Sequence, residues 1–248
     1  MDKYGIIGFP LEHSFSKRFF TEKFAREGIN AVYENFEIPD AKMLLEIVRD
    51  TPNLRGLNCT LPHKQAIIPM LHELSEMAKE IGAVNVIRIQ RNAMGEVKLK
   101  GFNSDIIGFM ESIKPLLSKN HHKALVLGTG GASKAICKGL TKLGLQWTYV
   151  SRTPREGFLT YNDITPEVIK EHQVIVNCSP VGMSPHVGEA PRLPYEAMDG
   201  QHLLYDLVYN PEETEFMKRG ARYGAIVKNG LEMLYLQAIA SWNIWNSY

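Results

Sequence analysis

The sequence predicts an α/β protein with two domains, and three observations support this prediction. Its 248 residues are long for one domain and comfortable for two small ones. A short apolar run at 124–127, a glycine-rich turn, a helix-like stretch at 132–143 and a β-type run at 146–150 follow one another. Strand and helix patterns then alternate again from 173 to 227, the order typical of a sheet with parallel strands.

Composition and charge exclude several classes of protein. Hydrophobic residues make up 44% of the chain, enough for a buried core, so global disorder is excluded. The 28 basic and 27 acidic side chains nearly cancel, so nothing indicates a nucleic-acid or anionic-membrane partner. Cys59, Cys137 and Cys178 are odd in number and widely spaced, which argues against a disulfide framework or a zinc site and fits a reducing compartment.

Targeting and membrane-spanning patterns are not found in the sequence. The first residues enter a short strand directly, without the apolar region of a signal peptide. Apolar runs stay well short of the roughly 20 residues that a transmembrane helix needs. We therefore expect a soluble, cytoplasmic protein with no membrane partner.

The first half of the chain alternates between apolar β-type runs and amphipathic stretches. A stripe of Phe19, Phe20 and Phe24 predicts a helix between Ser16 and Gly28. The other expected helices are 41–49, a stretch leading to Gly82, and 106–117. The expected strands are 4–9, 31–38, 56–59, 82–87 and 96–100.

Several polar residues follow these predicted strands. Ser14 and Ser16 lie in a polar loop, where helix capping by Ser16 is the simpler interpretation when they are taken alone. Thr60 and Lys64 follow the strand at 56–59, and ligands bind at the carboxyl edge of parallel sheets. Lysine is usually a solvated surface charge, so position alone gives only weak support for a chemical role of Lys64.

Two further polar residues admit both a structural and a functional interpretation. Asn85 stands among apolar neighbours, so it needs partners, which a ligand hydroxyl or a nearby loop backbone would supply equally well. Asp105 directly precedes the predicted helix at 106–117, and an N-cap is the simpler explanation for it.

The glycine turn points to a nucleotide. Gly128 permits the tight turn, and Gly130 lacks the Cβ that would block phosphates at a helix N-terminus. Ser133 occupies the usual third glycine position and is small enough for close packing of helix on strand. Glycine turns also occur in structural strand–helix loops, but the flanking pattern favours a dinucleotide.

The end of the predicted strand at 146–150, which follows the glycine turn and its helix, indicates which dinucleotide binds. Enzymes that use NAD usually carry a carboxylate there for the ribose 2′-hydroxyl. Here the chain reads Ser151, Arg152 and Thr153, with Arg155 just beyond, and a guanidinium can bind a phosphate in a fork. We therefore predict NADP(H) rather than NAD(H); the alternative is a surface arginine and dual specificity.

The remainder of the second half continues in the same way. A Pro- and Gly-rich loop between the strand at 173–176 and about Gly200 is long enough to suggest function or mobility. The final helix begins near Gly230 and contains Gln237, which alone would be expected to face solvent. The remaining elements are strands at 203–207 and 225–227 and a helix that ends at Gly220.

Taken together, eight segments resemble the shikimate dehydrogenase family from the N-terminal strand to the last helix. Each segment is weak alone, but their joint order and spacing are specific. The segments are His13–Ser16, Leu57–Lys64, Gly82–Asn85, Gly101–Asp105, the glycine turn, Ser151–Thr153, Asn177–Met183 and Gly230–Gln237.

The resemblance implies an enzyme that reversibly reduces 3-dehydroshikimate to shikimate with NADP(H), a step of aromatic amino-acid biosynthesis. It implies that Lys64 is the catalytic lysine and Asp105 its partner, and that no metal is needed. Substrate-binding roles fall on Ser14, Ser16, Thr60, Asn85, Tyr209 and Gln237. Cofactor-binding roles fall on Gly128, Thr129, Gly130, Gly131, Ala132, Ser151, Arg152, Thr153, Leu207 and Gly230.

The expected architecture follows from this resemblance. Residues 1–104 and 229–248 would form an N-terminal α/β substrate domain with a mostly parallel sheet, and residues 105–228 a Rossmann-like NADP-binding domain. The C-terminal helix would pack back on the first domain, with the active site in a cleft that opens and closes. The alternatives are a quinate/shikimate dehydrogenase with broader substrate and NAD use, and a non-catalytic binding protein on the same scaffold. A monomer or a homodimer is expected.

Overall fold

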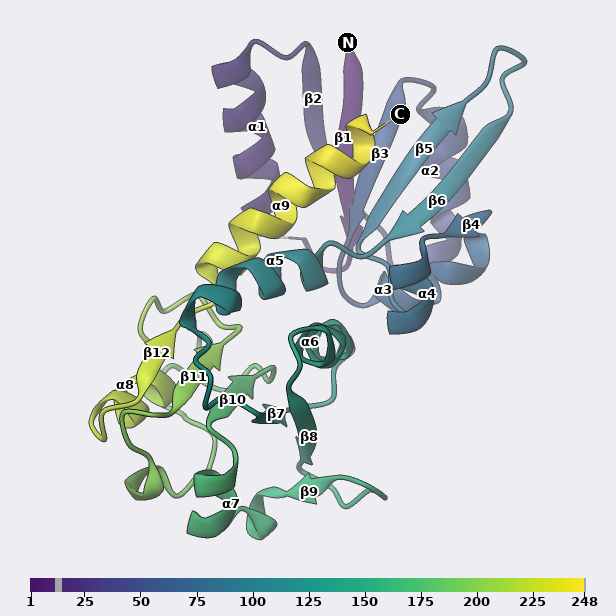
Figure 1. Cartoon of the computed structure of the whole chain (residues 1–248). Coiled ribbons are helices and arrows are strands. Elements are labelled where there is room, and N and C mark those ends of the chain that lie inside the picture. Colours follow the sequence, from purple (N-terminus) through teal and green to yellow (C-terminus); the bar gives the residue numbers. More distant parts are fainter. Residues whose placement is uncertain (12–14, 248) are drawn as a thin grey trace. The chain divides into compact units, whose positions relative to one another are not determined.

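The computed structural model describes residues 1–11 and 15–247, and its α/β fold confirms the predicted class. Contacts divide the chain into two compact units (Figure 1). Unit 1 comprises residues 1–104 and 238–248, and unit 2 comprises residues 105–237. The chain thus leaves unit 1 after Ser104 and returns to it at Ala238.

The sheet of unit 1 is mixed and has the strand order β2-β1-β3-β5-β6-β4. Strand β1 pairs in parallel with β2 and β3, whereas β5 is antiparallel to both β3 and β6, and β4 is parallel to β6. The strands are β1 (Asp2–Gly8), β2 (Ala31–Glu37), β3 (Leu54–Cys59), β4 (Glu73–Leu74), β5 (Val86–Arg91) and β6 (Val97–Phe102). The helices are α1 (Phe15–Glu27), α2 (Leu44–Asp50), α3 (His63–Ala66), α4 (Glu76–Ile81) and the end of α9 (Leu231–Asn246).

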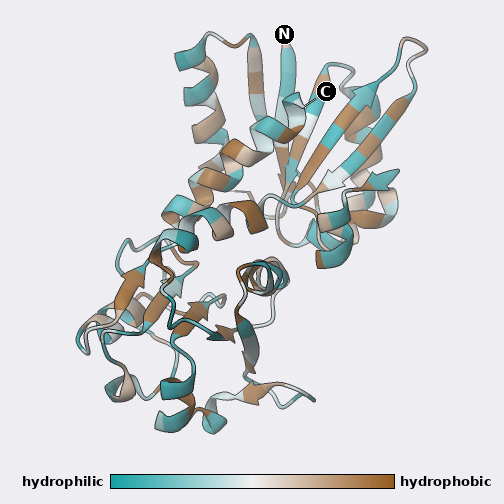
Figure 2. Cartoon of the chain, in the orientation of Figure 1, coloured by the Kyte–Doolittle hydropathy of each residue, from teal (hydrophilic) through white to brown (hydrophobic). Residues whose placement is uncertain are grey.

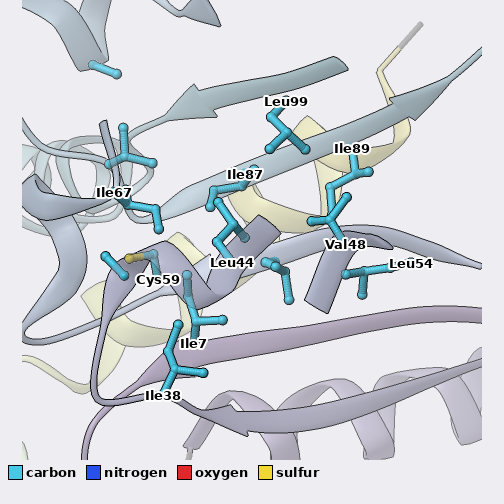
Figure 3. Close-up of a cluster of buried hydrophobic side chains, with 14 residues drawn as sticks. Ile7, Ile38, Leu44, Val48, Leu54, Cys59, Ile67, Ile87, Ile89 and Leu99 are labelled. Carbon is cyan, nitrogen blue, oxygen red and sulfur yellow. The ribbon is translucent and has the colours of Figure 1, made fainter. Parts of the chain in front are cut away.

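Alternation along the strands gives the sheet of unit 1 two apolar faces. Because successive side chains point to opposite faces, Tyr4 and Ile7 of β1 enter different cores. Ile7 packs with Leu44 of α2 and with buried aliphatic residues of β3, β5 and β6 (Figure 3). Tyr4 packs with the aromatic side chains of α1 and α9, where its ring centroid lies 5.0 Å from that of Trp245.

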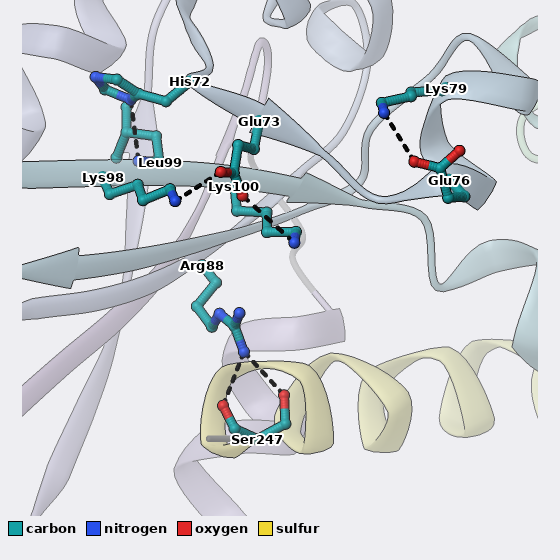
Figure 4. Close-up of polar contacts among 9 residues, drawn as sticks. All are labelled: His72, Glu73, Glu76, Lys79, Arg88, Lys98, Leu99, Lys100 and Ser247. Carbon is teal, nitrogen blue, oxygen red and sulfur yellow. Dashed lines mark hydrogen bonds and ion pairs between the residues drawn. The ribbon is translucent and has the colours of Figure 1, made fainter.

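The short strand β4 is held at the sheet edge by polar contacts. The backbone N–H of Leu99 donates to His72 Nδ1 at 3.0 Å, and Glu73 pairs with Lys98 and Lys100 at 2.6 and 3.4 Å (Figure 4). A two-residue strand with charged side chains is typical of a protected edge.

Unit 2 contains a parallel sheet of the order β9-β8-β7-β10-β11-β12, which is the doubly wound arrangement. The strands are β7 (Lys123–Leu127), β8 (Gln146–Ser151), β9 (Leu159–Thr160), β10 (Val174–Asn177), β11 (Leu203–Asp206) and β12 (Ile226–Lys228). The helices are α5 (Asp105–Ile113), α6 (Gly131–Lys142), α7 (Pro166–Glu171), α8 (Glu215–Ala221) and the beginning of α9.

Helices cover both faces of this second sheet. Val126 of β7 faces α5 and α6, whereas its neighbour Leu127 faces the cluster that contains Phe216 of α8. Strands buried on both faces read as continuous apolar runs, and in Figure 2 the strands of unit 2 are predominantly brown.

The structure corrects several element boundaries. The strand expected at 82–87 begins only at Val86 and continues to Arg91, because Gly82 (φ +67°) ends α4 in the left-handed conformation. Strand β9 and helix α7 were not expected from the sequence. The final helix, which the sequence predicts from Gly230 to about Trp242, continues to Asn246, and contacts assign its residues 231–237 to unit 2 and its remainder to unit 1.

Candidate active site

The glycine turn connects β7 to α6 and leaves open space above the helix N-terminus. Gly128 has φ +96°, and a Cβ there would lie 3.3 Å from the backbone nitrogen of Ser179. A Cβ on Gly130 or Gly131 would meet no atom within 4 Å, and no side chain caps α6 at Gly130. The first N–H groups of the helix therefore remain available to an anion.

Ser133 supports this turn from below. Its side chain is fully buried, and its hydroxyl donates to the Gly130 carbonyl at 2.7 Å and lies 3.4 Å from the Tyr149 hydroxyl. This burial confirms that a small residue is needed where helix and strand pack closely. The hydroxyl also fixes the last carbonyl before the helix.

A cavity of about 910 Å³ extends from the glycine turn along the carboxyl edge of the sheet in unit 2. Gly128, Thr129 and Gly130 line one end, and Ser151, Arg152, Thr153 and Arg155 line the wall that follows β8. Tyr161 and residues 178–181 and 189–192 complete the lining. The predicted cofactor residues Gly131 and Ala132 begin α6 and are not among the residues that line this cavity.

The cavity fits a dinucleotide with an additional phosphate. Ser151 is buried and its hydroxyl accepts from the N–H of Thr153 at 3.3 Å, which shapes the turn after β8. Arg152 and Arg155 are exposed at this turn and supply the positive charge. The glycine turn offers N–H groups to a pyrophosphate, and the guanidinium groups suit a second, separate phosphate.

Leu207 and Gly230, both predicted to contact the cofactor, lie side by side in unit 2. A Cβ on Gly230 would collide with the carbonyl oxygen of Leu207, so only glycine permits this approach. The N–H of Leu207 donates to the Asn177 carbonyl at 3.0 Å, which ties the end of β11 to the end of β10.

A buried carboxylate organises the loops at this edge. Asp206 is fully buried and accepts hydrogen bonds from Asn177, from the Thr214 hydroxyl and from the N–H of Val208 at 2.6–3.0 Å. Burial raises the pKa of Asp206 to about 6, although these donors oppose the shift. Asn177 in turn accepts from both the N–H and the hydroxyl of Ser179.

In unit 1 backbone hydrogen bonds hold the segments that carry the predicted residues Thr60, Lys64 and Asn85. The N–H of Val84 donates to the Lys64 carbonyl at 2.7 Å, and the N–H of Cys59 donates to the Asn85 carbonyl at 2.8 Å. Thr60 follows β3 directly and Lys64 lies in α3, where its side chain is half-buried. These three residues therefore gather at the carboxyl end of β3, the edge expected from the sequence.

Asn85 belongs to a buried polar network, which we call the unit 1 network. Its Oδ1 accepts from the N–H of Ser104 at 2.7 Å, and the hydroxyls of Ser104 and Ser241 lie 3.1 Å apart. Asn58 donates to the Ser241 hydroxyl at 3.0 Å and accepts from the Tyr33 hydroxyl at 2.8 Å. The amide of Asn85 therefore has the backbone partner that the structural interpretation foresaw.

The remaining predicted substrate residues have varied surroundings. Ser16 is buried and hydrogen-bonds with Tyr33, whose pKa burial raises strongly. Gln237 is buried on α9 and donates to the Leu234 carbonyl at 2.9 Å. Tyr209 is 40% exposed in the loop after β11, and Ser14 lies outside the described residues.

Three interpretations from the sequence are wrong. Ser16 does not cap α1, because the helix already begins at Phe15. Asp105 is the first residue of α5 rather than its N-cap, and it is buried at the positive end of the helix dipole. Gln237 does not face solvent, because α5 and α9 cross closely enough at Gly108 that a Cβ there would lie 3.0 Å from the Gln237 nitrogen.

Sequence reasoning missed several residues that shape the cofactor cavity. Tyr161, Glu189 and Arg192 line it from segments that carry no motif, and Asp206 supports it from beneath. In the sequence, the positive charge of Arg192 within a Pro-rich loop was the one signal that could have indicated a residue of this cavity.

The chain is similar to known proteins over nearly its whole length. A family model described as the shikimate dehydrogenase substrate binding domain matches residues 6–87. The shikimate dehydrogenase (NADP(+)) of Desulforamulus reducens is 33% identical, over 98% of this chain and 89% of that protein.

Two solved structures extend the similarity to the fold. The crystal structure of shikimate dehydrogenase from Aquifex aeolicus is 36% identical, with a TM-score of 0.85 over 99% of this chain and 92% of that one. The Thermus thermophilus enzyme, in complex with NADP(H) and shikimate, is 31% identical, with a TM-score of 0.84 over 99% of this chain and 94% of that one. The chain described here therefore belongs to the shikimate dehydrogenase family.

Proposed function

We propose that this chain catalyses the reversible reduction of 3-dehydroshikimate to shikimate with NADP(H), as an oxidoreductase that acts on a CH–OH group. One observation carries the cofactor side of the proposal: the cavity joins a glycine turn at a helix N-terminus to Arg152 at the end of β8. The substrate follows from membership of the family, to which the chain is similar over nearly its full length.

The cofactor would be held by the residues that line the cavity of unit 2. The glycine turn receives the pyrophosphate, and Ser151, Arg152 and Thr153 receive the adenosine ribose with its 2′-phosphate. Leu207 and Gly230 lie near the nicotinamide. When bound, NADPH supplies the hydride for the ketone carbon of the substrate.

Lys64 supplies the proton in this mechanism. Its ammonium group donates to the alkoxide oxygen that develops as the ketone is reduced, and its charge polarises the carbonyl beforehand. Asp105 holds the ammonium group in the required orientation and stabilises its charge. In the reverse direction the same lysine accepts the proton of the shikimate hydroxyl.

The other proposed substrate residues are hydrogen-bonding groups suited to a polyhydroxylated ring acid. Hydroxyls of Ser14 and Ser16 hold the substrate carboxylate, and Thr60, Asn85 and Gln237 surround the ring hydroxyls, with Tyr209 adjacent. The unit 1 network supports this role for Asn85, because its bonds to Ser104 fix the orientation of the amide. A preoriented amide loses little freedom when a ligand binds.

The decisive assay is shikimate-dependent reduction of NADP by the purified full-length chain. Quinate and NAD serve as parallel substrates, because comparable kcat/KM for quinate or for NAD would favour the broader quinate/shikimate dehydrogenase. Absence of turnover with every pair, combined with tight binding of shikimate, would favour a non-catalytic binding protein.

Two variants test the catalytic assignment. Lys64→Ala and Asp105→Asn are each expected to lower kcat by about 10²- to 10⁴-fold, the range for loss of general acid–base catalysis. Lys42→Ala removes an exposed lysine of the same unit and should leave kcat unchanged. Near-normal kcat in the Lys64 or the Asp105 variant would contradict the corresponding role.

We also propose a cytoplasmic location and a monomeric or homodimeric state. Cys59, Cys137 and Cys178 form no disulfide bond within the described part of the chain, which is usual for cysteines in a reducing compartment. Among the described residues, no helix is both long and apolar enough to span a bilayer. Cell fractionation and light scattering on the eluting protein would test the location and the oligomeric state.

A further inference from the structure

Three guanidinium groups line the cofactor cavity of unit 2, and only two of them follow β8. Arg152 and Arg155 come from the turn after that strand, whereas Arg192 comes from the loop between β10 and β11. About 40 residues separate the two segments in the sequence, so the cavity receives positive charge from two independent parts of unit 2.

The backbone around Arg192 is firmly anchored. Pro191 is buried, and its carbonyl accepts from the Tyr195 hydroxyl at 2.8 Å. The flanking residues Ala190 and Leu193 pack on the same buried cluster as Tyr161, which also lines the cavity. The exposed side chain of Arg192 therefore starts from a fixed position at the rim.

Arg152 is close to the same cluster. The charge of Arg152 acts on the hydroxyl of Tyr161, where it partly offsets the rise in the tyrosine pKa that burial causes. Tyr161 thus lines the same cavity as Arg152 and shares a hydrophobic cluster with Ala190 and Leu193, which flank Arg192 in the sequence. Arg152 and Arg192 therefore line the same cavity as Tyr161.

The positive charge of the cavity is only partly balanced by protein groups. Arg152, Arg155 and Arg192 make no hydrogen bond or ion pair with any residue in the ranges 1–11 and 15–247. Glu189 is the sole carboxylate among the lining residues, and its Oε1 lies 3.5 Å from His186 Nδ1. Three arginines facing one cavity repel one another unless an anion enters.

We propose that Arg192 is a specificity-determining residue that binds the 2′-phosphate of NADP together with Arg152. The proposal rests on the proposed function, because it assumes that the cavity holds NADP. The pyrophosphate already has the N–H groups of the glycine turn, so the arginines are left for the phosphate on the adenosine ribose. Two guanidinium groups that line one cavity can share the phosphate oxygens by paired hydrogen bonds.

Direct binding measurements on the full-length chain test this proposal. Calorimetry compares NADP, NAD, 2′-AMP and 5′-AMP on the wild type, Arg192→Ala and Arg192→Lys. Arg222→Ala is the matched control, since this exposed arginine of unit 2 does not line the cavity.

Loss of Arg192 should raise the Kd for NADP and for 2′-AMP about tenfold or more, the effect of one charge-assisted hydrogen bond to phosphate. The Kd for NAD and for 5′-AMP should stay within about twofold of the wild type. Arg192→Lys should recover part of the loss, because it keeps the charge but not the fork. Arg222→Ala should bind all four ligands like the wild type.

Equal losses for NADP and NAD would overturn the proposal, and so would unchanged binding of both phosphorylated ligands. The failure of the proposed function is a separate result, seen as a wild type that does not reduce NADP with shikimate. Because 2′-AMP binding needs no catalysis, the role of Arg192 is measured in either case.

Discussion

Unit 1 and unit 2 shape their parts of the proposed site in different ways. In unit 2 the proposed cofactor residues depend on backbone geometry, with Gly128 in a left-handed conformation and Gly230 packed closely against the backbone of Leu207. In unit 1 the corresponding edge depends on buried side chains, where the unit 1 network joins residues as distant in sequence as Asn58 and Ser241. A site shaped by the backbone tolerates few residue types at certain positions, such as glycine where φ is positive. A buried network of side chains instead depends on every member having a hydrogen-bond partner.

The largest expected effect tests the backbone half of this comparison. Gly230→Ala should destabilise unit 2 by more than about 3 kcal/mol, because the new Cβ meets a carbonyl oxygen that cannot rotate away. Gly130→Ala is the matched control, since a Cβ there meets no atom within 4 Å and φ is −73°. Chemical denaturation measures both.

The control variant Gly130→Ala also tests cofactor binding. Gly130→Ala should fold normally and bind NADP more weakly, because its Cβ occupies space intended for phosphates. A normal stability for Gly230→Ala would show that the loop after β11 yields easily and would break the comparison.

The next effect tests the side-chain half. Asn58→Ala should cost about 3 kcal/mol of unfolding free energy, because it leaves the buried hydroxyls of Tyr33 and Ser241 without their amide partner. Asn53→Ala removes a partly exposed asparagine that donates to the Met1 carbonyl, and it should cost less than about 0.5 kcal/mol. Equal costs for the two variants would mean that the network adds no stability.

A third effect depends on pH and involves Asp206 in unit 2. Its folded-state pKa of about 6 lies above the ordinary value of 3.8, so the folded state binds the proton more tightly. The stability that this group contributes is therefore present below about pH 4 and lost as the pH rises through about 6, by about 2–3 kcal/mol in total.

Urea denaturation between pH 4 and pH 7 measures this contribution as the difference between the wild type and Asp206→Asn. Asp199→Asn provides a contrast of opposite sign. Hydrogen bonds from the N–H of Gln201 and from His202 lower the pKa of Asp199, so its contribution is lost as the pH falls. Parallel stability curves for the wild type and Asp206→Asn would contradict the raised pKa.

The smallest expected effect lies at the sheet edge of unit 1. Glu73 pairs with Lys98 and Lys100 on the surface (Figure 4), and such pairs contribute little because water screens them. Glu73→Gln should change the unfolding free energy by less than about 0.5 kcal/mol in thermal or urea denaturation. A loss above about 1 kcal/mol would show that surface charge, as well as buried polarity, maintains unit 1.

The same contrast explains what the sequence could predict. The turn at Gly128 and the α/β order were predictable, because a tight turn and an alternating pattern each demand particular residue types in sequence. The mixed sheet and the unit 1 network were not, because strand pairing and partners such as Ser104 and Ser241 depend on contacts across long separations. Arg192 could not be assigned either, since its place at the cavity follows from the path of a loop.

The catalytic roles of Lys64 and Asp105 were not predictable from residue patterns alone. The roles of Lys64 and Asp105 come from motif resemblance, and each residue belongs to a different unit. The division of α9 between the units was also not predictable, because one uninterrupted helical pattern gives no sign of a boundary within it.

The path of α9 has a consequence for the synthesis of the protein. Residues 238–247 are translated after unit 2, yet Ala238 and Trp245 complete the core of unit 1, in which Tyr4 and Phe20 lie. While the ribosome is still making unit 2, the aromatic side chains of α1 and β1 are not yet covered by the end of α9. A nascent chain halted before residue 238 would therefore carry an exposed aromatic surface, the kind of surface that chaperones bind.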